Sequence, residues 1–572
     1  MANVYTIGNV RKKSDPDEYN DPRAKHISEW IRASDEYRNK VLGENFYKSA
    51  DDLYSLKDAG SPSPSFRPLI RIPMLQRIML EEASQISDMS PQIYVFGDKD
   101  RDKDREKALQ AQWVAAKINQ HTLYASLTAR YCGTGFIVSG FDPDLRNGKG
   151  GIWCKSMDPR MVGFDPSTDY TWDPAYVYYG TWMNIEDVRL KWPDTSKGVR
   201  PNRGSQSPAP LSGDSGYGIQ MPTGPMQSTP GMPFQSGRKN YSSDTRVLVH
   251  HVFCKDYTRE VVESKDKPLE DELIDPEVIL RYPNGRWLVE CNGIILSDGD
   301  NPYPKRSDIM APHFPIFPVW ALPALNSAWG VPVTSMTIDM QQLAQRLYTQ
   351  AFENCIRLNN GVWFLDNNSG IDPEAFGGLP GEVVVKNAGS KTPECVSPNA
   401  LSASAMQVPE QLLKLQNQVL GFGEARQGNP GQGNISTDLF DSSVLQSSGL
   451  LQLSGRLLSN TLQMLGEFMF GVMGRYMGRQ NLPLRGVNGI EMAEWQGLIR
   501  PDQYDVLLDE ASIRPLSDSV IRRMTPELMK TGIVATERGL RTLGYPGAEE
   551  IAEEQKSNLE LAALAKTRGN RK

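Results

Sequence analysis

Apolar residues recur at helical spacing through residues 330–358, which is the most regular pattern in the chain. One face of the predicted helix carries Met336, Met340, Leu343, Leu347, Ala351 and Leu358. At 1.5 Å per residue this helix would be roughly 40 Å long. A short strand-like island follows, with strand candidates at 361–365 and 382–386. A second helical pattern then covers 403–420.

A loop rich in glycine and asparagine follows the second helix. Its glycines are Gly421, Gly423, Gly428, Gly431 and Gly433, so we expect a segment that holds no single rigid shape. Apolar residues at heptad-like spacing then predict a long packed helix that ends near residue 478. This order of elements is typical of a mechanical component, a protein segment that lines or spans a larger structure. It contains no pattern typical of an active site.

The N-terminal half alternates between helical and strand patterns. Helices are expected at 22–40, at 72–86 and, as one continuous element, from 98 to about 131. Strands are expected at 93–96, at 136–138 and at 152–155, with the last two forming a hairpin.

Further strands are predicted toward the middle of the chain. They cover 245–253 and a second hairpin, in which 278–282 pairs with 287–289 across a turn at 283–285. Between the two groups of strands, Ser, Pro, Gly, Gln and Met dominate residues 196–243. That composition predicts a disordered insertion.

The C-terminal part has a strand pattern at 504–508 and then helical patterns at 525–531, 536–543 and 548–566. It ends in a small basic tail, Lys566, Arg568, Arg571 and Lys572.

Length and composition indicate an ordinary globular chain with several cores, because 572 residues exceed the usual ~100–200 per domain. The net charge of −7 argues against tight binding of nucleic acid over the whole surface, but not against a protein along which DNA slides. The six cysteines form no CxxC pair, so we expect reduced and mostly buried thiols. Neither a signal peptide nor a membrane-spanning helix is expected.

Motifs for catalysis or cofactor binding were sought without success. The chain has no phosphate-binding loop of the G-x-x-x-x-G-K-[ST] type and no G-x-S-x-G elbow, so we expect no catalytic residues and no cofactor. His250, His251 and Cys254 suggest metal ligands, but adjacent residues on a strand point to opposite faces, which disfavours a metal site. Asp158 and Asp165 are the other candidates, and turn capping is the favoured role for both.

Five segments, taken in order, resemble tailed-bacteriophage portal proteins, also called head-to-tail connectors. They are Ile72-Pro73 through Ser90-Pro91; Gly133-Thr134-Gly135-Phe136 with Met157-Asp158-Pro159-Arg160 and Phe164-Asp165-Pro166; Arg281-Tyr282-Pro283-Asn284-Gly285-Arg286; Gly330-Val331-Pro332; and Pro526 through Leu543-Gly544. Each segment is short, and their order along the chain makes the resemblance fairly specific. It extends over most of residues 20–560.

The resemblance implies an α+β fold of the phage portal type with named parts. They are an N-terminal arm and wing (1–315), a first stem helix (316–358), a clip (359–402), a second stem helix (403–420), a channel or tunnel loop (421–437), a long wing and channel helix (438–478), a wing return strand (479–515) and a helical crown with the basic tail (516–572). The insertion at 196–243 departs from the family pattern.

The function implied is a ring of identical subunits, usually twelve, at one capsid vertex. Double-stranded DNA would pass through its channel during packaging and ejection. Implied partners are the terminase packaging motor, a head-tail adaptor or tail proteins, and the major capsid and scaffolding proteins, with no membrane. The protein would assemble in the host cytoplasm and reside in the virion.

Two groups of residues become candidate sites under this resemblance. The channel loop would bring Arg426, Gln427, Asn429, Gln432 and Asn434 close to DNA, where they would contact the backbone without reading sequence. The clip would dock partners through an acidic surface made of Asp366, Asp372, Glu374, Glu382 and Glu394. Two alternatives stay open, a DNA packaging or processing enzyme and another ring-forming head-tail adaptor.

Overall fold

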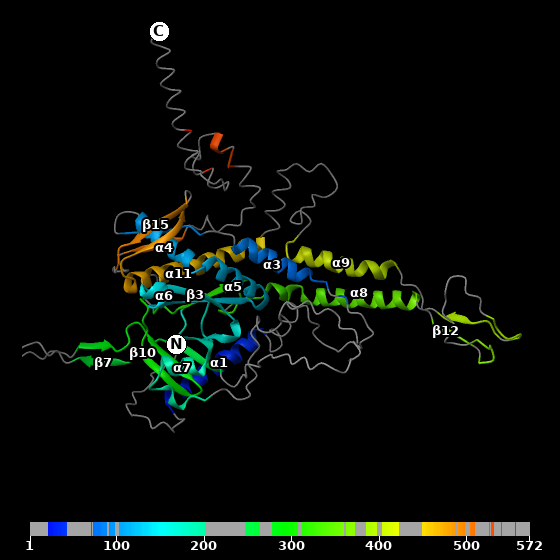
Figure 1. Ribbon diagram of the computed structural model, residues 1–572, viewed down its shortest axis with the longest axis horizontal. Coiled ribbons are helices and arrows are strands. Elements are labelled where there is room, and N and C mark those ends of the chain that lie inside the picture. Colours follow the sequence, from blue (N-terminus) through cyan, green and yellow to red (C-terminus); the bar gives the residue numbers. More distant parts are fainter. Residues whose placement is uncertain are drawn as a thin grey trace, which may run out of the picture. The chain divides into compact units, whose positions relative to one another are not determined.

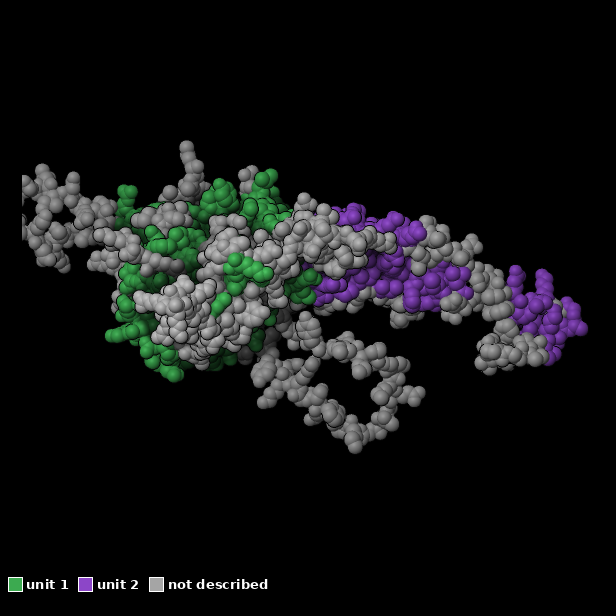
Figure 2. Space-filling model, turned by 90° about the horizontal axis from the view of Figure 1, so that it is seen from above, with its two compact units in different colours: residues 1–47, 79–332, 449–572 green, residues 48–78, 333–448 purple. Residues whose placement is uncertain are grey.

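The computed structural model divides into two compact units (Figure 2). Unit 1 comprises Met1–Tyr47, Met79–Pro332 and Gly449–Lys572, and unit 2 comprises Lys48–Ile78 and Val333–Ser448. The residues described are 21–42, 70, 72–87, 91–97, 102–200, 246–262, 277–306, 312–325, 327–359, 362–365, 367–371, 385–389, 391–396, 403–422, 449–486, 489–497, 504–508, 525–526, 528–530, 539 and 555. The fold is mixed α+β, as expected from the sequence. Among the described helices, none is long and apolar enough to cross a membrane.

Most described helices belong to unit 1. They are α1 (Pro22–Leu42), α4 (Lys103–Ala115), α5 (Ile118–Cys132), α6 (Leu145–Gly148), α7 (Ile185–Lys191), α11 (Gly449–Tyr476) and the short 3-10 turns η1 (Pro159–Met161) and η2 (Ser196–Gly198). The division between the two units falls inside α3 (Met74–Ser87).

Two antiparallel sheets form the body of unit 1 (Figure 1). The larger has the order β10 (Ile294–Asp300), β9 (Arg286–Cys291), β6 (Arg246–Cys254), β5 (Tyr176–Asn184), β4 (Val162–Phe164). The smaller has the order β11 (Ile316–Trp320), β2 (Thr134–Asp142), β3 (Gly151–Met157). Three strand pairs complete the unit: β1 (Ile93–Phe96) with β16 (Asp505–Leu508), β7 (Arg259–Val262) with β8 (Glu277–Leu280), and β14 (Gln480–Gly486) with β15 (Gly489–Trp495).

A close backbone contact positions the smaller sheet. Gly133 ends α5 with φ +86°, and a Cβ there would lie 2.1 Å from the carbonyl oxygen of Gly330, so no larger residue fits. The backbone N–H of Gly330 donates to Thr134 Oγ1 at 2.8 Å, and that of Ala321 donates to the Gly133 carbonyl at 3.0 Å. Two segments that carry the family resemblance, 196 residues apart, therefore meet at this point.

The long helix α11 packs on β11 through apolar residues and two hydroxyls. Leu458, Leu462 and Leu465 are buried, as the heptad-like spacing predicts. Ser454 Oγ and Thr461 Oγ1 each donate a hydrogen bond of 2.6 Å, to the carbonyl oxygens of Ala321 and Pro318 respectively. These hydroxyls bond the carbonyls beside a buried strand and set the position of the helix along it.

The adjacent histidines of β6 point to opposite faces, as expected. His250 Nδ1 lies 2.8 Å from Glu290 Oε2, whereas His251 stacks on the ring of Tyr179 with centroids 4.8 Å apart. Burial lowers the pKa of His251 to about 3, so this imidazole is neutral near pH 7. No cluster of three metal-ligating side chains occurs among the residues that the structure describes.

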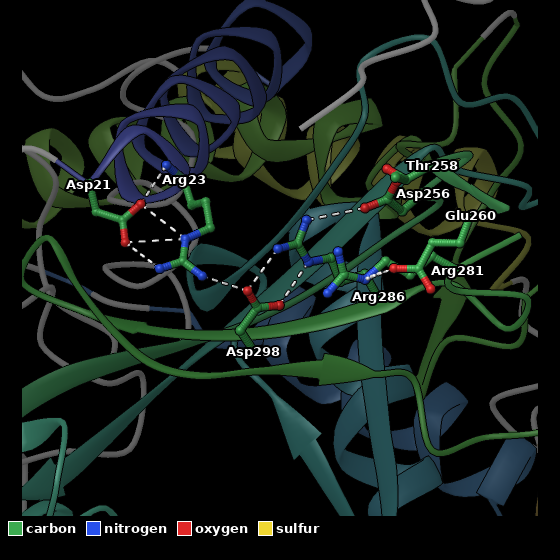
Figure 3. Close-up of polar contacts among 8 residues, drawn as sticks. All are labelled: Asp21, Arg23, Asp256, Thr258, Glu260, Arg281, Arg286 and Asp298. Carbon is green, nitrogen blue, oxygen red and sulfur yellow. Dashed lines mark hydrogen bonds and ion pairs between the residues drawn. The ribbon is translucent and has the colours of Figure 1, made fainter. Parts of the chain in front are cut away.

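Helix α1 is attached to the larger sheet by a network of charged groups (Figure 3). Arg286 binds Asp298 with two hydrogen bonds of 2.7 Å, and its Nη1 donates to buried Asp256 at 3.1 Å. Arg23 of α1 adds a third bond to Asp298 at 2.6 Å and also holds Asp21. Burial acts to raise the pKa of Asp298, but hydrogen bonds and charge from Arg286 and Arg23 outweigh it, so the pKa lies below its ordinary value.

Unit 2 is built around two antiparallel helices, α8 (Ile338–Asn359) and α9 (Ala403–Val419), which pack side by side (Figure 1). The 3-10 turn η4 (Val333–Met336) precedes α8. Between the helices, β12 (Val362–Phe364) pairs with β13 (Glu394–Val396). Residues 70–72 run along α8, because Ile70 N–H donates to Thr349 Oγ1 at 3.2 Å and Gln345 Nε2 donates to the Ile72 carbonyl at 3.3 Å.

Several predicted elements differ from the structure. The helix expected to run from 98 to 131 is two helices, because Lys117 adopts a left-handed conformation with φ +53°. The hairpin expected across 283–285 is wrong, since β8 pairs with β7 while β9 pairs with β10. The turn that joins β9 to β10 is Asn292-Gly293, both residues with positive φ, as a two-residue hairpin turn requires.

Two boundaries also differ. The disordered insertion predicted at 196–243 is wrong for its first residues, because Ser196–Gly198 forms η2 and Val199 is buried among Ile185, Val247 and Val249. Residues 201–243 lie outside the described residues. The strand predicted at 382–386 is not the partner of β12, and its described residues, 385 and 386, are outside any strand.

The charged network leads to a pH-dependent prediction. Asp298→Asn should lower the free energy of unfolding by about 1 kcal/mol at pH 7, because it weakens hydrogen bonds to charged groups at a site that solvent partly screens. The unfolded chain protonates this carboxyl near pH 3.9, and the folded chain only at lower pH. The stabilisation is therefore present above about pH 4 and is lost as pH falls through the folded pKa.

Urea unfolding followed by tryptophan fluorescence at pH 7 and pH 3 measures this difference. Asp194→Asn is the matched control, since Asp194 is an exposed aspartate that follows α7 and does not belong to this network. If the two substitutions lower the free energy of unfolding equally at pH 7, the role assigned to Asp298 is wrong.

Candidate functional site

The channel-loop residues Arg426, Gln427, Asn429, Gln432 and Asn434 all lie outside the described residues. The structure does describe the point where that loop begins. After α9, the N–H of Phe422 donates to the Asn417 carbonyl at 2.7 Å and that of Gly421 to the Gln418 carbonyl at 3.1 Å. Gly421 has φ +67°, and Phe422 is buried. This is a Schellman motif, which ends the helix at a defined residue.

Four of the five acidic clip residues, Asp366, Asp372, Glu374 and Glu382, also lie outside the described residues. Glu394 is described. It is the first residue of β13, opposite Phe364 of β12, and both side chains are exposed. The proposed acidic surface therefore stays a prediction, with one exposed carboxylate placed beside an exposed aromatic ring.

The exposed apolar face of α8 is the main feature of unit 2. The residues predicted to share a face do so by their spacing, but only Ala351 of the six is buried. Leu343 of α8 is exposed and Met340 and Leu347 are partly exposed, and Met336, in the 3-10 turn η4 just before the helix, is also exposed. These four residues, spaced by four, three and four, form the α8 stripe. Such spacing is the heptad pattern with which helices pack against one another.

Helix α9 carries a matching set. Val408, Leu415 and Val419 are exposed and Leu412 is partly exposed, again spaced by four, three and four. These residues form the α9 stripe. The sequence reasoning predicted helix 403–420 but missed this face, although its 4-3-4 spacing is visible in the sequence. Together the two stripes leave eight large apolar side chains wholly or partly uncovered.

The buried residues of the same helices are small or polar. Within α8 they are Gln341, Ala344 and Ala351, with Thr337 just before it, and within α9 they are Pro409 and Gln416. Leu420, which directly follows α9, is a buried large apolar residue at this end of the pair. Most stand one position after a stripe residue, as Ala344 follows Leu343 and Gln416 follows Leu415. One residue is a turn of 100° around a helix, so the buried set and the stripe occupy neighbouring faces.

The two carboxylates considered for catalysis have structural roles. Asp158 accepts the backbone N–H of Arg160 at 2.9 Å and pairs with its guanidinium at 2.6 Å. Asp165 accepts the backbone N–H of Ser167 at 3.1 Å and its hydroxyl at 2.6 Å. Turn capping, the favoured expectation for both, is confirmed.

Unit 1 contains an open cavity of about 390 Å³ between α11 and the residues around β11. Tyr170, Trp320 and Leu457 line it with Arg306 and Glu467. Two of its polar groups are engaged, because Arg306 Nη1 donates to the Trp172 carbonyl at 2.8 Å and Gln463 Nε2 donates to Glu467 at 3.3 Å. Nothing in this geometry indicates a reacting group.

No protein-family model matches the chain, and no curated protein matches it significantly. The functional conclusion therefore rests on the short resembling segments and on the geometry of unit 2.

The end of α9 yields a stability prediction. Gly421→Ala places a side chain in a left-handed conformation, which costs about 1–2 kcal/mol, so α9 should fray from its C-terminus. Hydrogen exchange of the segment 403–419 should accelerate. Gly449→Ala is the control, because a Cβ at Gly449 meets nothing within 4 Å. The Schellman assignment is wrong if the amides of segment 403–419 exchange at the same rate in both variants.

Proposed function

We propose that the chain is the subunit of a portal ring of the tailed-bacteriophage type, through which double-stranded DNA is packaged and ejected. In this proposal α8 and α9 are the stem helices, the β12–β13 region is the clip, and the segment after Phe422 is the channel loop. The wing, long helix and crown follow the boundaries that the resemblance implies. The protein acts as a structural component of the virion at one capsid vertex, and not as an enzyme.

The observation that carries the proposal is the pair of apolar stripes. Fully burying a Leu, Val or Met side chain stabilises by about 1.5–3 kcal/mol. Covering eight exposed or partly exposed side chains would therefore contribute several kcal/mol per subunit. A chain that presents two heptad-spaced faces on neighbouring helices is suited to pack against copies of itself, and head-to-tail contacts that close on themselves form rings.

The C-terminal end of α9 and the loop that follows it support the same proposal. The Schellman motif and buried Phe422 provide a fixed base from which a glycine-rich loop can extend. The loop carries one cation, Arg426, and four polar amides, which suits brief contacts with a moving phosphate backbone. The terminase motor and the adaptor or tail proteins would dock at the clip, and the capsid and scaffolding proteins would surround the ring.

Ring formation is tested by negative-stain imaging of the purified full-length chain. We expect rings of about twelve subunits with a central hole. Leu343→Glu or Leu415→Glu should abolish them, because each places a charge in a stripe that assembly would bury. Light scattering coupled to size-exclusion chromatography gives the mass of each species.

Leu190→Glu is the matched control. Leu190 is an isolated, largely exposed leucine on α7 in unit 1, so its replacement should leave rings intact. Monodisperse single subunits of the unaltered chain at high concentration would overturn the proposal.

The loop has its own test. Deleting residues 423–433 should leave rings intact and impair DNA packaging or retention in an assembled particle. Arg426→Ala should have only a modest effect, because one exposed cation contributes little in physiological salt. Rings that fail to form after the deletion would show that the loop is structural.

A further inference from the structure

Among the described residues of α8 and α9, the fully buried positions carry no large apolar side chain, while Leu412 and Leu413 of α9 are partly buried. The buried residues of α8 are Ala344, Ala351 and Gln341, and buried Thr337 lies just before the helix. The longest buried side chain of α9 among the described positions is that of Gln416, which is 0% exposed. The larger apolar side chains of both helices lie on the stripes, where Leu343 is 47% and Leu415 is 44% exposed.

Several of these buried polar atoms lack hydrogen-bond partners among the described residues. Gln416 leaves both Oε1 and Nε2 unpaired, and Thr337 leaves its Oγ1 unpaired. Gln341 donates through Nε2 to the Ile72 carbonyl, but its Oε1 is unpaired. Buried polar atoms without partners destabilise the packing that buries them.

The backbone of α9 adds a third weakness. Pro409 lies inside the helix, where it cannot donate the i to i−4 hydrogen bond. Unit 1 also contains unpaired buried atoms, such as Gln112 Oε1, but its long helix α11 differs from the α8–α9 pair. Helix α11 buries leucines at heptad spacing, and its buried Ser454 and Thr461 hydroxyls are both bonded.

We propose that the α8–α9 contact is a weak joint, which opens in the single subunit far more readily than unit 1 unfolds, and which neighbouring subunits hold closed. This inference rests on the proposed ring, since the stripes are the surfaces that neighbours would cover. In the assembled ring the weak joint lets α8 and α9 shift against each other, because little apolar contact within the subunit is lost when the helices move.

The test is native-state hydrogen exchange of the full-length chain, compared between single subunits and assembled forms. In single subunits, segments 338–359 and 403–419 should exchange at least about a hundredfold faster than 449–476, through a local opening that exposes them without global unfolding. In assembled rings the first two segments should gain protection, and 449–476 should change little.

The Gln416→Leu substitution tests whether the buried amide of Gln416 weakens the α8–α9 contact. Removing two unpaired buried atoms and adding apolar contact should slow exchange of both stem segments in single subunits about tenfold or more. Gln418→Leu is the matched control, with the same substitution at an exposed position two residues away, and it should leave exchange unchanged.

Two results would overturn the weak joint. One is protection of 403–419 equal to that of 449–476 in single subunits. The other is a Gln416→Leu variant that exchanges as fast as Gln418→Leu or faster. The weak joint and the ring fail separately, because the two substitutions are compared in single subunits. Absence of rings at any concentration overturns the ring and the claim that neighbouring subunits hold the joint closed, but it leaves the weakness of the α8–α9 contact to be decided by exchange in single subunits.

Discussion

Unit 1 depends on the contact between Gly133 and Gly330. Their backbones approach so closely that a Cβ on Gly330 would lie 2.5 Å from the Gly133 carbonyl oxygen. The start of β2, the residues after β11 and the chain that leads to α8 are all positioned by this contact, because each lies within a few residues of it. The hydroxyl bonds from Ser454 and Thr461 then set α11 against the same strand. A side chain at either glycine would therefore displace a sheet, a helix and the entry to unit 2 together.

The two units obtain stability in different ways. Unit 1 buries large aromatic and aliphatic side chains in continuous clusters, with its interior charges paired, as in the 2.5 Å bond between Arg130 and Glu82, each 2% exposed. Such a pair is costly to break, because one partner alone leaves an uncompensated buried charge. Unit 2 instead buries alanine, threonine and glutamine between its helices and leaves leucine and methionine outside. Unit 2 therefore gains less from apolar burial between its helices than unit 1 gains from its clusters.

Periodicity in the sequence was enough to place the longer helices and about half of the described strands, since apolar spacing reflects which face a segment buries, but it missed strands such as β5, β10 and β11. Periodicity failed where the backbone conformation of one or two residues determines the local structure. Lys117 breaks a helix through a conformation that lysine rarely adopts, and Asn292 with Gly293 forms a hairpin turn that competed with a nearby Pro-Asn-Gly turn. Spacing located the α8 face, but it could not say whether that face is buried within the chain or left for a partner. The unpaired amide of Gln416 was likewise beyond prediction, because polarity in a sequence does not reveal burial.

The pairing of β1 with β16 has a consequence for the order of events during synthesis. Ile93 lies opposite Leu508, so more than four hundred residues separate the two strands of this pair. Chains emerge from ribosomes at roughly 5–20 residues per second, and contacts distant in sequence form late. The helices of unit 2, which are close neighbours in sequence, therefore emerge and can pair while unit 1 still lacks its final strand. The nascent chain exposes the stripes before β16 is available to pair with β1, and non-native apolar contacts during that interval are the hazard that this topology creates.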